Sequence, residues 1–330
     1  MSDVICYQRT CALKNYIYLD WNVIQYMKHK TITNVFDAVK FKEFISELSA
    51  TYAFPASEGH LRDLASTFNE DNLKYIEDDL AFLKEISKGL MLGINPDESL
   101  TPVEADISSE FEKIKLDTTP YPDIKVTGGS FKIDMNKLSK DSLFRPLLEK
   151  NGGTLDASVM ESFIHMMQDS IDNHEIYKKF RIEVSNLKSS FSNNNTVLSK
   201  EGPYFKNLEA FIGYFEINDI DLLLKSFSKI QESFLAIDDR KLKSLTKGQK
   251  IENAYALLDF HPLFRNKINK KNKPENMYRD LKNLFFASDA IYYVTEDDSS
   301  YKKSKFVAKA LGLRVRVMKM NELRLKLTCI

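Results

Sequence analysis

The sequence contains few of the residues that interrupt regular secondary structure: 330 residues include 11 glycines and 9 prolines. Long helices and strands are therefore expected. The three cysteines, Cys6, Cys11 and Cys329, form neither a disulfide framework nor a metal-spaced pair. No apolar run reaches the roughly 18 residues that cross a bilayer, and the N-terminal residues lack the apolar core of a secretion signal. We therefore expect a cytoplasmic protein that does not contact a membrane.

Net charge is absent as well, because 47 Lys and Arg residues balance 47 Asp and Glu residues. The balance conceals an asymmetry, since residues 240–330 contain 21 basic and 9 acidic residues and the remainder 26 basic and 38 acidic. A basic C-terminal part favours contact with a polyanion such as nucleic acid. Two differently charged, solvated faces explain the pattern equally well.

Strand-like and helix-like patterns alternate at both ends of the chain. We expect strands at 16–20, 52–56, 290–295 and 313–317, and helices at 22–27, 36–48, after the N-cap Ser57, 277–287 and 304–311. Alternation of this kind predicts a parallel sheet with helices on its faces.

The middle of the chain is predicted to be mainly helical, with long helical patterns at 157–179 and 217–237. Each α/β end is too short to form a sheet alone, so we expect the two ends to combine. The predicted organisation is an α/β domain made of residues 1–96 and 251–330, interrupted by a helical insertion of residues 97–250. The insertion would recognise a substrate, a second copy of the chain or a regulatory protein.

Acidic residues accompany these elements at both ends. Asp20 ends the first strand and Asp297 follows the strand at 290–295, while Glu58, Asp63 and Asp280 lie on predicted helices. The carboxyl ends of parallel strands meet at one edge of a sheet, where we expect the acids to converge. Converging carboxylates repel one another unless a divalent cation neutralises them, and hard oxygen ligands suit Mg²⁺ or Mn²⁺. Such ions activate water and stabilise phosphoryl oxygens.

Three strings together resemble the PIN-like nuclease family: Leu19-Asp20-Trp21-Asn22 before a helix, Ser57…His60…Asp63 on one helix, and Asp280 followed by Val294-Thr295-Glu296-Asp297. The resemblance covers about the first third and the last sixth of the chain. It implies a PIN-like, Rossmann-like parallel sheet flanked by helices and a cluster of acids that holds Mg²⁺ or Mn²⁺. It also implies hydrolysis of single-stranded RNA, with DNA not excluded.

By this resemblance, Asp20 is the first acid, Asp280 the third, and Asp297 the acid after the last strand of the site. Asp63 matches the helical position of the second acid best, and Glu58 is the alternative. All five are predicted metal ligands, and the four aspartates are the predicted catalytic residues. Trp21 departs from the family, which usually carries a small polar residue there.

Each acid also has a purely structural interpretation. Asp20 and Asp297 suit a helix cap and a solvated loop. Asp63 can pair with Arg62 or Lys74, and Asp280 with Arg279 or Lys282. His60 is expected to be a hydrogen-bonded helix residue rather than a ligand or base.

Basic residues near the third and fourth acids complete the hypothesis. Those expected to contact the phosphates of a nucleic acid are Arg265, Lys267, Lys270, Lys271, Lys273, Lys302 and Lys303. A solvated cationic loop and helix face is the alternative.

The sequence therefore predicts a metal-dependent endoribonuclease, with a toxin or antiphage defence role suggested by family association alone. The alternative is a catalytically inactive PIN-like module that binds RNA or a protein partner.

Overall fold

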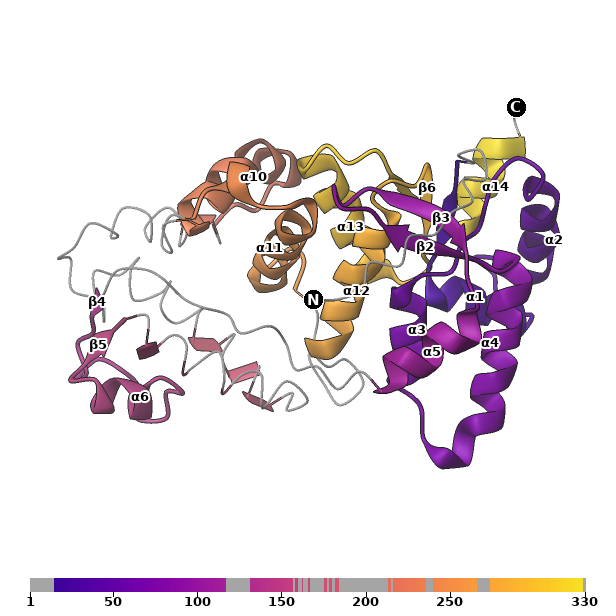
Figure 1. The fold of residues 1–330 in the computed structure, drawn as a ribbon. Helices are drawn as coiled ribbons and strands as arrows, with labels where there is room; N and C mark the ends of the chain where they lie inside the picture. Colours follow the sequence, from indigo (N-terminus) through magenta and orange to yellow (C-terminus); the bar gives the residue numbers. More distant parts are fainter. Residues whose placement is uncertain are drawn as a thin grey trace. The chain divides into compact units, whose positions relative to one another are not determined.

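The computed structural model describes residues 15–116, 131–156, 216–235, 240–265 and 274–328, with residues 213 and 214 and isolated residues between 158 and 183. The chain forms two compact units (Figure 1). Unit 1 comprises residues 1–118 and 279–330, and unit 2 comprises residues 119–278. Among the described residues, no helix has the length and apolar character needed to cross a membrane.

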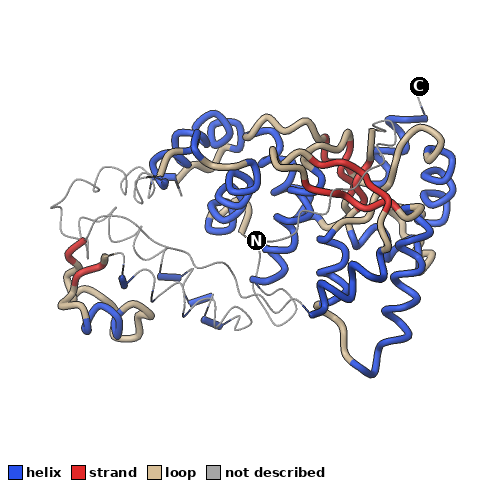
Figure 2. Tube along the Cα trace, viewed as in Figure 1, coloured by secondary structure: helices blue, strands red, loops and turns tan. Residues whose placement is uncertain are grey.

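Unit 1 is built around a parallel three-stranded sheet in the order β1-β6-β7. Its strands are β1 (Ile17–Leu19), β6 (Tyr292–Val294) and β7 (Arg316–Met318). Every residue of β1 and β6 is buried, as expected when helices cover both faces of a parallel sheet. Figure 2 shows these strands surrounded by helices. The predicted α/β class with a parallel sheet flanked by helices is confirmed.

The segment 52–56 does not form the regular strand that was predicted. Only Ala53 and Ala56 make parallel bridges, to Tyr16 and Met91. Pro55 lies between them and has no N–H to donate to a ladder, which explains why the pairing stays at single residues. The segment nevertheless connects β1 to the antiparallel hairpin of β2 (Leu90–Ile94) and β3 (Leu100–Glu104).

The helices of unit 1 include those predicted at 22–27, 36–48, after Ser57, 277–287 and 304–311, and further helices that were not predicted. The helices of unit 1 are α1 (Trp21–Lys28), α2 (Ala38–Leu48), α3 (Glu58–Ala65), the 3-10 turn η1 (Glu70–Asn72), α4 (Leu73–Ser87), α5 (Ile107–Leu116), α13 (Asp298–Ala310), α14 (Met320–Thr328) and residues 279–287 of α12 (Pro274–Ala287). One core joins Ile17 and Val294 of the sheet to Phe41 of α2, Leu61 of α3 and Phe111 of α5. Residues far apart in the sequence thus share one apolar interior.

Three helix starts explain where the acids lie. Ser57 caps α3, as predicted, and its side chain accepts from the His60 N–H in a capping box. Asp20 caps α1 and Asp297 caps α13. The Asp297 cap starts α13 at residue 298, whereas the sequence predicted a start at 304.

Unit 2 contains the elements β4 (Phe131–Lys132), α6 (Arg145–Lys150), β5 (Thr154–Leu155), α10 (Ile220–Leu235), η3 (Leu242–Ser244) and α11 (Lys247–Phe260). The long helix predicted at 157–179 lies largely outside the described residues.

The limits of the units differ from the predicted insertion at both ends. Residues 97–116 belong to unit 1 because β3 pairs with β2, and because α5 buries Ile107 and Phe111 in the core of that unit. Residues 251–278 belong to unit 2. Propensity alone did not reveal these assignments, because they depend on which core each apolar face joins.

Candidate acidic site at the sheet edge

Asp20 lies where β1 ends and α1 begins, and only 4% of its surface is exposed. Its Oδ1 accepts from the Trp21 N–H at 2.8 Å and from Asn283 Nδ2 at 3.2 Å. Its Oδ2 accepts from Thr295 Oγ1 at 2.6 Å and from Asn22 Nδ2 at 2.7 Å. Burial raises the pKa of Asp20, and the bonds from Thr295 and Trp21 oppose that rise. The carboxylate is therefore held firmly in one orientation.

Thr295 and Asn22 join the loop after β1 to the loop after β6. Thr295 is fully buried, and its hydroxyl accepts from Asn22 Nδ2 at 3.2 Å and from the Asp297 N–H at 3.3 Å. Asn22 Oδ1 accepts from the Glu296 N–H at 3.1 Å. Sequence reasoning assigned neither residue a role in the site. Their positions, Thr295 at the end of one predicted strand and Asn22 two residues after another, were the available signal.

Asn283 was also missed, and it connects α12 to Asp20 and to α3. It lies three residues after Asp280, on the same helix face. Its Oδ1 accepts from the Tyr18 hydroxyl at 2.8 Å, and that hydroxyl lies 2.7 Å from Ser57 Oγ. The chain of buried polar contacts therefore runs from Ser57 through Tyr18 of β1 and Asn283 to Asp20.

Gly59 permits this close approach of α3 and α12. A Cβ at position 59 would lie 2.6 Å from Asn283 Oδ1 and 3.2 Å from both Ser57 Oγ and the Tyr18 hydroxyl. We expect Gly59→Ala to lower the free energy of unfolding by about 1–3 kcal/mol, the usual cost of overpacking. Urea denaturation measures this loss, with Gly93→Ala as the control, because a Cβ there meets only ordinary contacts from 3.5 Å. Unchanged stability in Gly59→Ala would contradict the packing described.

His60 is a structural residue, as predicted. It is fully buried, and its Nε2 donates to the Leu19 carbonyl at 2.7 Å. Its Nδ1 therefore accepts, and the Ser57 N–H donates to it at 3.0 Å. The ring stacks on Tyr18 with centroids 4.9 Å apart. Burial lowers the pKa of His60 to about 4, so the neutral ring joins α3 to the end of β1.

Asp280 is the acid most affected by the others. Burial raises its pKa well above the usual value, and the charges of Asp20, Asp297 and Asp63 raise it further, while Lys303 opposes the rise. Within the described part of the chain, Asp280 has no hydrogen-bond donor and no ion pair. The four predicted aspartates, from four separate segments, therefore lie within electrostatic range of one another.

Asp63 and Glu58 differ in their relation to this group. Asp63 influences Asp280 and Tyr18, and its Oδ1 lies 3.6 Å from Arg279 Nε on α12. Glu58 Oε1 instead accepts from Arg62 Nε at 2.6 Å on its own helix. The geometry favours Asp63 over Glu58 as the second acid. Arg279 is thus one partner of Asp63, whereas the structural interpretation of the sequence had named Arg62 or Lys74.

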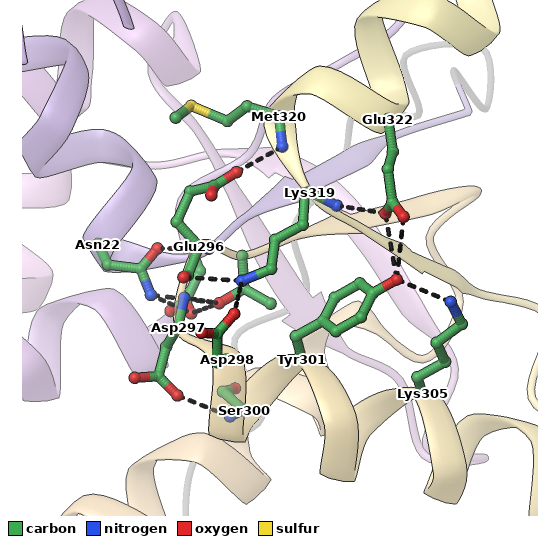
Figure 3. A network of polar contacts seen from close by, with 12 residues as sticks. Asn22, Glu296, Asp297, Asp298, Ser300, Tyr301, Lys305, Lys319, Met320 and Glu322 are labelled. Atoms are coloured by element: carbon green, nitrogen blue, oxygen red, sulfur yellow. Dashed lines mark hydrogen bonds and ion pairs between the residues drawn. The ribbon is translucent and has the colours of Figure 1, made fainter. Parts of the chain in front are cut away.

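Asp297 is exposed and caps α13, with its Oδ1 accepting from the Ser300 N–H at 2.7 Å. Figure 3 shows the next residues of this loop anchored to α14. Lys319 Nζ donates to the Glu296 carbonyl at 2.7 Å and lies 3.0 Å from Asp298 Oδ1. Glu296 Oε1 accepts from the Met320 N–H at 2.6 Å. The loop that carries Asp297 is therefore held at several points.

The basic residues predicted to contact nucleic acid differ in how exposed they are. Arg265 and Lys302 are exposed. Lys303 is only 1% exposed and lies close enough to Asp280 to affect its pKa, so its assignment as a surface phosphate contact was wrong. It lies on the inward face of α13, together with Ser300, Ser304 and Val307. The predicted contacts Lys267, Lys270, Lys271 and Lys273 lie outside the described residues.

The donor set agrees with a hard divalent cation in chemistry and charge. Carboxylates are the ligands Mg²⁺ and Mn²⁺ prefer, and Asp280 is a partly buried acid that receives no hydrogen bond from the described residues and lies near three other acids and Lys303. Among the described residues, however, no three Asp, Glu, His or Cys side chains converge closely enough to hold an ion as they stand. Holding an ion therefore requires rotation of side chains such as Asp63 or Asp280.

In comparisons with known proteins, no family model, curated protein or solved structure matches the chain.

Proposed function

We propose that unit 1 is a PIN-like nuclease domain that hydrolyses phosphodiester bonds in single-stranded RNA with Mg²⁺ or Mn²⁺. The observation that carries the proposal is the shared electrostatic environment of Asp20, Asp63, Asp280 and Asp297. Asp20, Asp297 and Asp63, from three other segments, all raise the pKa of Asp280, and a metal ion bound among these acids would relieve their repulsion.

The residues of the proposed site would have different roles. Asp20, oriented by Thr295, Asn22 and Asn283, would be the most rigid ligand. Asp280, with Asp63 or Asp297, would complete the set. Bound there, Mg²⁺ or Mn²⁺ would neutralise a phosphoryl oxygen and lower the pKa of the attacking water. Lys302, which is exposed, would hold a neighbouring phosphate of the RNA backbone.

A second candidate is a catalytically inactive module that binds RNA or a protein. The observation favouring it is that both oxygens of Asp20 already accept two hydrogen bonds each, which leaves little capacity for a metal ion. Titration with Mn²⁺ separates the candidates. An intact site gains about 2.7 kcal/mol of stability at a metal concentration one hundred times the Kd, and an inactive module gains none.

Cleavage of end-labelled single-stranded RNA by the purified full chain tests the first candidate. We expect cleavage in Mn²⁺ and Mg²⁺ and none in EDTA, because the acids need a cation to act on phosphate. Asp63→Asn should reduce cleavage strongly, and Glu58→Gln should leave most of it, since Glu58 is occupied by Arg62. Cleavage that persists in EDTA, or in Asp63→Asn, would show that the activity arises elsewhere.

A further inference from the structure

A groove of about 660 Å³ lies in unit 1, away from the acids, between α13 and α14 and over β7. Its apolar part includes Leu313, Val315, Val317 and Leu325. Leu325 is 65% exposed, which is unusual for a leucine unless something covers it. None of the residues lining the groove has a role in the proposed nuclease, so the groove needs its own explanation.

The rim of the groove is cationic. Its basic residues Lys305, Lys309, Arg316 and Lys326 are all exposed. The acid in its lining, Glu322, is already occupied: its carboxylate accepts from the Tyr301 hydroxyl at 3.1 Å and 3.2 Å and from the Lys319 N–H at 2.8 Å (Figure 3). The groove therefore presents positive charge beside apolar surface, the complement of a segment that is both acidic and apolar.

The floor of the groove is the outer edge of the sheet. In the parallel pairing of β6 and β7, the Arg316 N–H donates to the Ile291 carbonyl and the Met318 carbonyl accepts from the Thr295 N–H. Alternate residues of a parallel strand direct their backbone groups to opposite edges, so Val317 directs its N–H and C=O away from β6. No strand pairs with that edge among the described residues. Such an edge is a template for another extended chain.

We propose that this groove binds an extended acidic segment of a partner protein, which adds as a strand to β7. The Val317 backbone would form the ladder, while apolar side chains of the segment lie on Leu313 and Leu325 and alternate acidic side chains meet the basic rim. RNA would contact the basic rim, but it would pair neither with the backbone edge of β7, which has no partner strand among the described residues, nor with the apolar lining of the groove. The proposal does not depend on the nuclease function.

Selection from a displayed library of random ten-residue peptides tests the proposal. The full chain serves as bait, and the double variant Lys309→Glu/Arg316→Glu serves for counter-selection. Selected peptides are then labelled with fluorescein and titrated by anisotropy, alongside a ten-nucleotide oligouridine as the RNA probe. Lys74→Glu/Lys140→Glu is the matched control, because it makes the same charge change at exposed positions outside the groove.

We expect the selected peptides to alternate acidic and apolar residues and to bind the groove variant at least about tenfold more weakly. Binding to the control variant should be unchanged. Hydrogen exchange at the Val317 amide should slow on binding, and backbone N-methylation of the peptide should abolish binding.

The proposal is overturned if no sequence distinguishes the chain from the groove variant, or if N-methylated peptides bind equally well. Binding of oligouridine, but of no peptide, that is lost in the groove variant would assign the groove to RNA and overturn it as well.

Discussion

Asp280→Asn is expected to reduce metal-dependent RNA cleavage by at least about a hundredfold and, at the same time, to stabilise the metal-free protein. The two effects have one cause. Asp280 is a partly buried carboxylate that accepts no hydrogen bond from the part of the chain that the structure describes, and burial raises its pKa together with Asp20, Asp297 and Asp63. Removing its charge removes a ligand from the site and an unfavourable interaction from the fold, which we expect to be worth about 1 kcal/mol or more.

The gain in stability should depend on pH with a defined sign. A carboxyl group whose pKa is higher in the folded than in the unfolded state destabilises the fold increasingly as the pH rises above the unfolded value. Asp280→Asn should therefore stabilise the protein more at pH 8 than at pH 5. Urea denaturation in EDTA at both values measures this.

The exposed Asp78 of α4 supplies the matched control, since Asp78→Asn makes the same chemical change outside the site. Undiminished cleavage in Asp280→Asn, or a metal-free protein less stable than the wild type, would remove Asp280 from the proposed site.

Asp20→Asn is a less informative variant than Asp280→Asn. Both oxygens of Asp20 accept from two donors, so an amide nitrogen in either position would face donors rather than acceptors. A buried hydrogen bond lost in this way costs about 1–3 kcal/mol, and lost activity could then reflect lost folding.

His60→Asn is expected to change how stability depends on pH. The unfolded chain protonates this histidine near pH 6.5, whereas the folded protein keeps it neutral down to about pH 4. Between these values the unfolded state binds the extra proton, so the contribution of His60 to stability is present above pH 6.5 and is lost as the pH falls. The loss amounts to about 3 kcal/mol between pH 7 and pH 4.

At pH 7 the variant should be about 2 kcal/mol less stable than the wild type, because it lacks the bond to the Leu19 carbonyl and the stacking on Tyr18. The difference should shrink or reverse toward pH 4, since the variant has no group to protonate there. The acidic residues make the same pH-dependent contribution to the stability of both proteins, so their contribution cancels in the difference. His29→Asn, at an exposed position of the same unit, is the control. A constant difference between His60→Asn and the wild type across this range would show that His60 is not buried in its neutral form.

The sequence by itself determined the elements whose signals are local. The apolar runs ending at Asp20 and Thr295 predicted two strands of the sheet, and Ser57 predicted the start of α3, because strand burial and helix capping depend on neighbouring residues. The strand ends pointed to Asp20 and Asp297, because the ends of parallel strands meet at one edge, whereas Asp63 and Asp280 were named from predicted helices and from the resemblance to PIN-like nucleases. These four acids share one electrostatic environment.

Other features were beyond local reasoning. The limits of the two units depend on which core each apolar face joins, and the basic segment around Lys303 read as surface although that lysine is buried. Asn283 showed no pattern, because its partners Asp20 and Tyr18 lie more than 260 positions away.

Local patterns therefore predicted the strands β1 and β6 and the start of α3. The tertiary structure alone decided how Asp20 is held and, among the described residues, which acid has no hydrogen-bond donor and which edge of the sheet has no paired strand. Hydrogen bonds and repulsion between distant segments act only once the chain has brought those segments together.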